Sequence, residues 1–89
     1  MSWSIGFKGT KEDTKKNLEL QAQSPLASYA GKPEGADILA ALDRASSLID
    51  SIALTEELPL VNATAYGSHT TYPEGVSQAE FHVIVSRSK

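Results

Sequence analysis

Residues 38–52 read ILAALDRASSLIDSI, and the spacing of their apolar residues decides the fold. The apolar positions recur every three or four residues, which places them on one face of an α-helix. They are Ile38, Leu42, Ala45, Ile49 and Ile52. The pattern therefore predicts an amphipathic helix over residues 36–53. Leu39 and Leu48 widen its apolar stripe, which indicates a second contact surface on this helix.

Three other segments alternate apolar with polar residues, which is the period of a half-buried β-strand. They span residues 2–8, 60–66 and 78–87. The apolar members that we expect to face the helix are Trp3, Ile5, Phe7, Val61, Ala63, Ala65, Phe81, Val83 and Val85. Residues 67–75, GSHTTYPEG, are rich in turn-forming residues and are predicted to join the last two strands as a hairpin.

A shorter helix is predicted at residues 11–22, with Thr10 as its N-cap. Only three apolar residues anchor it, namely Leu18, Leu20 and Ala22. Residues 24–35, SPLASYAGKPEG, hold two prolines and two glycines and are predicted to be a loop. The resulting order is β-α-α-β-β. We therefore expect an α+β fold, a three-stranded antiparallel sheet with the helices packed on one face.

Length and composition narrow the class of protein. A chain of 89 residues can enclose one core, so residues 1–89 are predicted to form a single domain. A core this small favours self-association, and we expect a homo-oligomer. The net charge of −3 argues against general nucleic-acid binding. No segment has the apolar length of a signal peptide or a membrane span, and cysteine is absent, so we expect a cytoplasmic protein without membrane contact.

Both ends of the chain resemble a known group of proteins. The segments WSIGFKG at 3–9, VNATAYGSH at 61–69, PEG at 73–75 and HVIVS at 82–86 are similar to small accessory proteins encoded by tailed bacteriophages. The resemblance implies a phage protein in the cytoplasm of an infected bacterial host. It implies no activity and no site residues.

The sequence lacks the motifs of common catalytic and cofactor sites. It contains no Gly-x-Gly-x-x-Gly, no phosphate loop, no His-Glu-x-x-His and no cysteine pair. We therefore expect a protein that is not an enzyme and carries no cofactor. His69 and His82 could bind a metal with Glu74 or Glu80 only if the hairpin brought them together. Solvated histidines are the more common case, so no metal site is predicted.

The sheet face turned away from the helices mixes aromatic, apolar and hydroxyl side chains. Ile84 and Ser86 belong to this face by alternation. The predicted ligand-binding residues on it or in the loop beside it are Asn62, Thr64, Tyr66, His69, Tyr72 and His82. Lys8 and Arg87 are expected to attract the negative charge of a ligand. Such a surface suits either a stacked heterocycle or a protein partner.

Two functions remain open at this stage. In the first, a self-associating protein sequesters a small nucleotide-like ligand, which in a phage would make it a sponge for a nucleotide signal of bacterial defence. In the second, the chain is a protein-binding or assembly module that contacts a host protein and has no small-molecule ligand. Both functions need the same exposed surface, so the sequence does not separate them.

Overall fold

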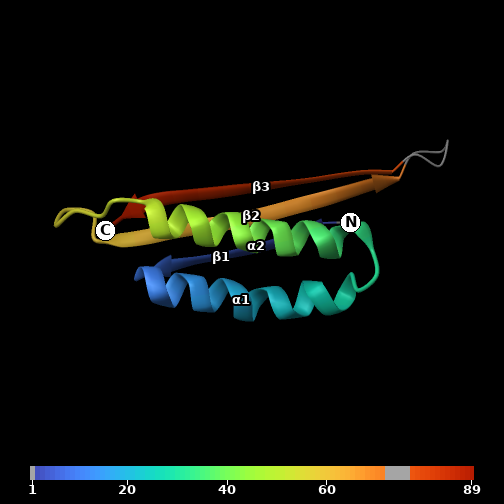
Figure 1. The fold of residues 1–89 in the computed structure, drawn as a ribbon, viewed down its shortest axis with the longest axis horizontal. Helices are drawn as coiled ribbons and strands as arrows, with labels where there is room; N and C mark the ends of the chain where they lie inside the picture. The colour runs from blue at the N-terminus through green and yellow to red at the C-terminus, as the bar shows by residue number, and fades with distance from the viewer. Residues whose placement is uncertain (1, 72–76) are drawn as a thin grey trace.

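The computed structural model describes residues 2–71 and 77–89. Its elements, in chain order, are β1 (Ser2–Gly9), α1 (Lys11–Ser28), α2 (Pro33–Ser51), β2 (Leu60–Thr71) and β3 (Ser77–Ser88). The three strands form one sheet in the order β1-β2-β3, and each neighbouring pair is antiparallel. Both helices lie on the same side of the sheet (Figure 1). The predicted α+β fold is confirmed.

The core lies between the two helices and the inner face of the sheet. Helix α1 packs against β1, and α2 packs against β2 and β3. The buried apolar residues are Trp3, Ile5, Leu18, Ala22, Tyr29, Ile38, Ala41, Ala45, Ile49, Val61, Ala63 and Ala65. The stripe predicted for α2 therefore faces the sheet, with Leu42 and Ile52 partly buried at its margins.

Helix α1 is longer than the sequence indicated. The prediction of a helix ending near residue 22 and a loop at 24–35 was wrong, because α1 continues through Pro25 to Ser28 and α2 begins at Pro33. Proline inside a helix removes one backbone hydrogen bond and costs roughly 3 kcal/mol. Leu26 and Tyr29 pack against the core beyond it, and this burial offsets the cost.

The buried face of α1 also differs from the prediction. Leu20 is 53% exposed, whereas Thr14, Leu18 and Ala22 are buried. These three residues are four positions apart, so they lie along one side of the helix, and Leu20 falls outside that side. Gln21 instead turns toward the edge of the sheet and bonds to β1.

The final hairpin is longer than predicted. Residues 67–71 were expected in the connection, but they belong to β2. Antiparallel pairing runs without interruption from Leu60 opposite Ser88 to Thr71 opposite Ser77. Turn-forming residues such as Gly67 and Ser68 therefore lie within the strand ladder, because cross-strand pairing outweighs their local preference.

Ile49 provides a test of this packing. It is fully buried on α2, so Ile49→Ala should lower the free energy of unfolding by about 2–5 kcal/mol through the cavity that it leaves. Leu39, on the same helix, is 58% exposed, and Leu39→Ala should change stability by no more than about 0.5 kcal/mol. Urea denaturation of both variants measures the difference. Equal losses of stability would contradict the orientation of α2.

Candidate functional site

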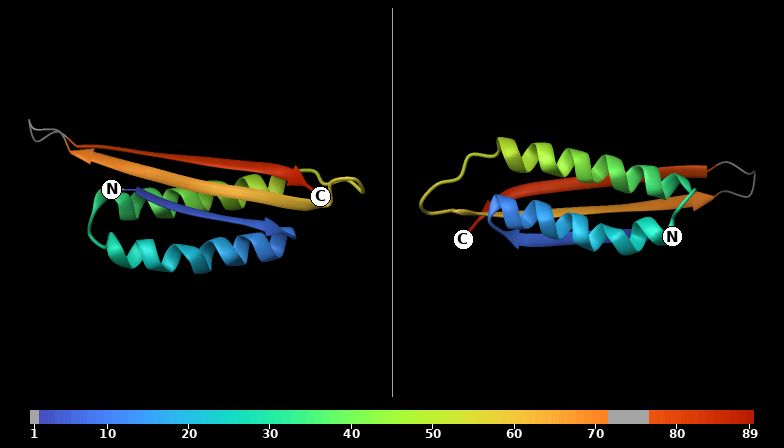
Figure 2. Two further views of the ribbon diagram at one scale, coloured as in Figure 1. Left: turned by 180° about the vertical axis from the view of Figure 1, so that it is seen from behind. Right: turned by 60° about the horizontal axis from the view of Figure 1, so that its bottom comes forward.

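No helix covers the outer face of the sheet in the described part of the chain (Figure 2). Side chains alternate between the two faces, so those opposite the core residues point to this outer face. Register aligns them in rows across the strands. One row contains Ser4, Tyr66 and His82, and the next toward the end of β2 contains Ser2, Ser68 and Glu80. Small and hydroxyl residues on β1 and β2 therefore stand beside two aromatic rings.

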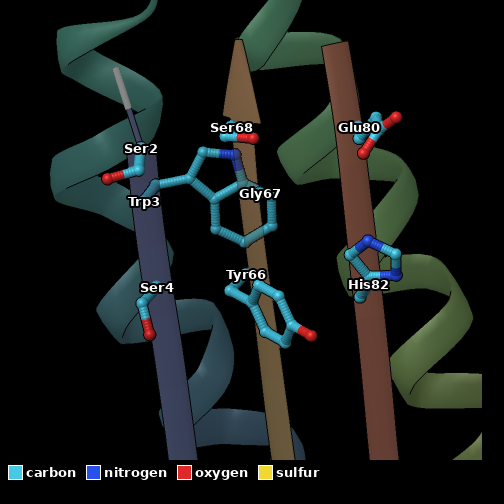
Figure 3. Close-up of a pocket in the computed structure, with 8 residues that line it drawn as sticks. All are labelled: Ser2, Trp3, Ser4, Tyr66, Gly67, Ser68, Glu80 and His82. Atoms are coloured by element: carbon cyan, nitrogen blue, oxygen red, sulfur yellow. The ribbon is translucent and has the colours of Figure 1, made fainter.

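These two rows surround a shallow depression of ≈ 590 Å³. It is lined by Ser2, Trp3, Ser4, Tyr66, Gly67, Ser68, Glu80 and His82, which come from all three strands (Figure 3). A depression of this size is within the range of small-ligand sites. Its residues approach one another only because the antiparallel register places the end of β2 between β1 and β3.

Tyr66 and His82 form the aromatic part of the site. They are directly opposite each other on β2 and β3, and their ring centroids are 5.3 Å apart with a tilt of 33° between the rings. This tilted arrangement is favourable for an aromatic pair. Tyr66 is 41% exposed, so its ring remains open to a further contact.

Trp3 and Gly67 form the base of the depression. Trp3 is 6% exposed, and its indole extends from β1 toward Gly67 of β2 (Figure 3). A Cβ atom at residue 67 would lie 2.7 Å from Nε1 of Trp3, closer than van der Waals contact allows. Glycine is therefore required here because the indole occupies the space that a side chain would fill.

The predicted site residues separate into three groups. Tyr66 and His82 come together, and Thr64 lies one row away from them. Asn62 and Lys8 share a row farther along the strands, roughly 13 Å from Tyr66 at the usual strand rise. Lys8 is thus on the expected face but distant from the aromatic pair.

Arg87 does not contribute to the site, and the predictions for the His69 side chain and for Tyr72 lie outside the described residues. Arg87 pairs with Val61 in a row of the inner face, and its Nη1 is 3.5 Å from the carbonyl oxygen of Ala53. His69 extends β2 opposite Ala79, but its side chain is outside the described part of the structure, as is all of Tyr72.

Sequence reasoning missed four polar residues of the lining, Ser2, Ser4, Ser68 and Glu80. The signal for the two serines of β1 was their alternation with Trp3 and Ile5. Only the strand order and register could show that they lie beside Tyr66. Among the described residues of the lining, Glu80 is the one that carries a charge.

Gly67→Ala tests the base of the site. The added methyl would crowd the Trp3 indole and also lie 2.8 Å from the carbonyl oxygen of Glu80. We expect a loss of about 1–3 kcal/mol in stability, as for other overpacked positions, together with a shift in Trp3 fluorescence. Ser68→Ala, at the exposed neighbouring residue, should change neither. Unchanged stability and emission in Gly67→Ala would contradict the close contact.

Comparison with known proteins assigns neither a family nor a function to this site. No family model, no curated protein and no solved structure matches the chain. Among the described residues, no cluster of three or more histidine, cysteine, aspartate or glutamate residues could hold a metal ion, and no helix could cross a membrane. The resemblance to phage proteins therefore stays a prediction from the sequence.

Proposed function

We propose that this protein is a non-catalytic binding protein that holds a flat heterocycle, of the nucleobase type, against the outer face of its sheet. The observation that carries the proposal is the paired rings of Tyr66 and His82 beside a depression based on Trp3. A planar ligand can stack on the exposed Tyr66 ring, and stacking of a base on an aromatic side chain contributes about 1–3 kcal/mol.

Polar groups around the rings suit the edge of a base. Ser2, Ser4 and Ser68 bring three hydroxyls to the lining, and each hydroxyl can both donate and accept a hydrogen bond. Glu80 adds a carboxylate, which can accept from the amino group of a base. A mostly apolar depression with a few polar groups at its margin is typical of small-ligand sites.

The described lining offers more contacts to a base than to a phosphate. The described lining includes Glu80 and no cation, and Lys8 is two rows away from the aromatic pair. A phosphate that extends along the strands could approach Lys8. We therefore expect nucleosides to bind at least as well as nucleoside phosphates. In an infected bacterium, such binding would sequester a nucleotide-derived signal.

A second candidate function, binding of a protein partner, is favoured by one observation. Ile84 is 56% exposed on the same outer face, one row from Tyr66 and His82. An apolar side chain beside two rings is the kind of surface that a protein interface covers. The two functions can be separated by experiment, because a protein partner would not need the serine-lined depression.

Tyr66→Ala provides the test. Trp3 is the only tryptophan of the sequence, so its fluorescence reports on the site without a label. Titration with adenosine, guanosine, their 5′-monophosphates and their cyclic 3′,5′-monophosphates should change the emission of the wild-type protein. Loss of the stacking ring should weaken the Kd about tenfold or more.

Leu39→Ala is the matched control, because it removes another exposed side chain from the far side of the molecule. Its Kd should equal that of the wild type. Two results would contradict the proposal: no change in Trp3 emission at millimolar nucleoside, or a Kd that Tyr66→Ala leaves unaltered. In either case the protein-partner function would be favoured.

A further inference from the structure

The two edges of the sheet differ in how they are covered. At the β1 edge, Gly6 donates its amide to Oε1 of Gln21 at 3.0 Å and accepts from Nε2 of Gln21 at 2.6 Å. Tyr29 donates its hydroxyl to the carbonyl oxygen of Ser2 at 3.1 Å. Side chains of α1 and of its C-cap residue Tyr29 thus occupy the positions that a further strand would take. The β1 edge is closed to strand addition.

Among the described residues, nothing covers the β3 edge in a comparable way. Because Gly6 bonds outward to Gln21, Gly6 and Thr64 form a non-hydrogen-bonded pair, and alternation directs the amide and carbonyl of Thr64 toward β3. The odd-numbered residues of β3 then direct their own backbone groups away from β2. In the described part of the chain, no side chain bonds to the backbone of Phe81, Val83 or Val85. These residues present a row of strand-pairing groups.

Two exposed apolar side chains flank this open edge at the same position along β3. Ile84 is 56% exposed on the outer face of β3. Leu48 is 39% exposed on α2, four residues after Arg44, so both point to the same side of the helix. Arg44 lies 5.1 Å from the ring centroid of Phe81, which identifies that side as the one toward β3.

The position of Leu48 along the length of β3 follows from the contacts of Arg44 and Ile52, four residues before and after it on α2. Helix α2 and β3 run in the same direction (Figure 1). Arg44 stands at Phe81, and Ile52 lines a depression with Val85 and Arg87. Leu48 is midway between Arg44 and Ile52, which places it near the level of Ile84. An exposed apolar residue therefore lies on each side of the β3 edge, Ile84 on the outer face and Leu48 on the helix side.

We propose that β3 pairs antiparallel with β3 of a second copy of this chain, around a twofold axis that passes beside Ile84. A twofold axis is the common symmetry of protein dimers, and it matches an edge to itself. The two three-stranded sheets become one six-stranded sheet. All four helices lie on one of its faces, and the outer face is continuous.

Pairing of the two β3 strands around Ile84 gives each residue along the edge a compatible residue opposite it. Even-numbered residues form the non-hydrogen-bonded pairs, in which side chains are closest, so Ile84 contacts Ile84 of the partner subunit. Val83 comes opposite Val85 of the partner subunit, and Phe81 comes opposite Arg87 of the partner subunit. No two like charges are opposite each other in this register.

The spacing of the helices also fits. Strands in a sheet are about 4.8 Å apart, and α2 lies over β2 and β3, so its axis is about 5 Å from the twofold axis. The two copies of α2 are then about 10 Å apart, which is the packing distance of neighbouring helices. Leu48 of each copy lies in that contact.

The dimer would also extend the candidate site. Pairing around Ile84 brings Ser86 of the partner subunit opposite His82, on the same outer face. The wall of the depression beyond His82 is then supplied by the second copy. The pairing rests on the edges alone, however, and stands whether or not a nucleoside binds.

Ile84→Cys tests the register directly, because the natural sequence has no cysteine. Across the twofold axis the two thiols would be in a non-hydrogen-bonded pair with Cα atoms about 4.5 Å apart, within disulfide range. Mild oxidation at micromolar protein, without ligand, should convert most of this variant to a covalent dimer. Ser86→Cys is the matched control on the same strand and face. Its two thiols would be about 13 Å apart along the strands and should not be linked.

A second measurement uses the uncrosslinked protein. Light scattering should give twice the 9.5 kDa of one chain for the wild type, and one chain for Leu48→Glu, because that carboxylate would be buried at the helix contact. Leu39→Glu, at a residue of α2 that is also exposed but points away from β3, should remain dimeric. A monomeric wild type, or equal crosslinking of Ile84→Cys and Ser86→Cys, would overturn the proposal.

Discussion

Small residues at the contact between α2 and β2 allow the helix to lie close to the sheet, and the other features depend on this contact. Ala41 and Ala45 of α2 are buried in one core with Ala63 and Ala65 of β2. Close approach lets a short chain bury large side chains such as Ile49 around these alanines. Because both helices are needed to cover that single face, the described chain has no element left for the other. An open outer face is the consequence of a core this small.

Periodicity predicted the elements, and packing between distant residues decided their ends. The spacing of Ile38 and Ile49 was sufficient to orient α2, since a helical stripe is a local property. Pro25 gave a misleading signal, because its local cost is offset by the burial of Tyr29, and that residue reaches a strand 27 positions earlier in the chain. Local sequence contains no information on such a contact.

The candidate site was predicted in part for the same reason. Alternation placed Tyr66 and His82 on the outer face, and the structure pairs their rings. The same alternation assigns Arg87 to the inner face with Val85, so its inclusion in the site neglected the period of its own strand. Ser4 could not be found from sequence, because its place beside Tyr66 is a matter of register between strands far apart in the chain.

The unequal edges of the sheet would connect the open outer face to the proposed dimer. Closing β1 with Gln21 leaves β3 as the edge at which a copy can add, and β3 is the strand that carries His82. A ligand that contacts both His82 and Ser86 of the partner subunit would bind the dimer more tightly than the monomer. By linkage, it would then strengthen the dimer by the same factor. Ligand binding and dimer assembly would then use the same surface, which is why amino-acid composition alone could not separate the two functions.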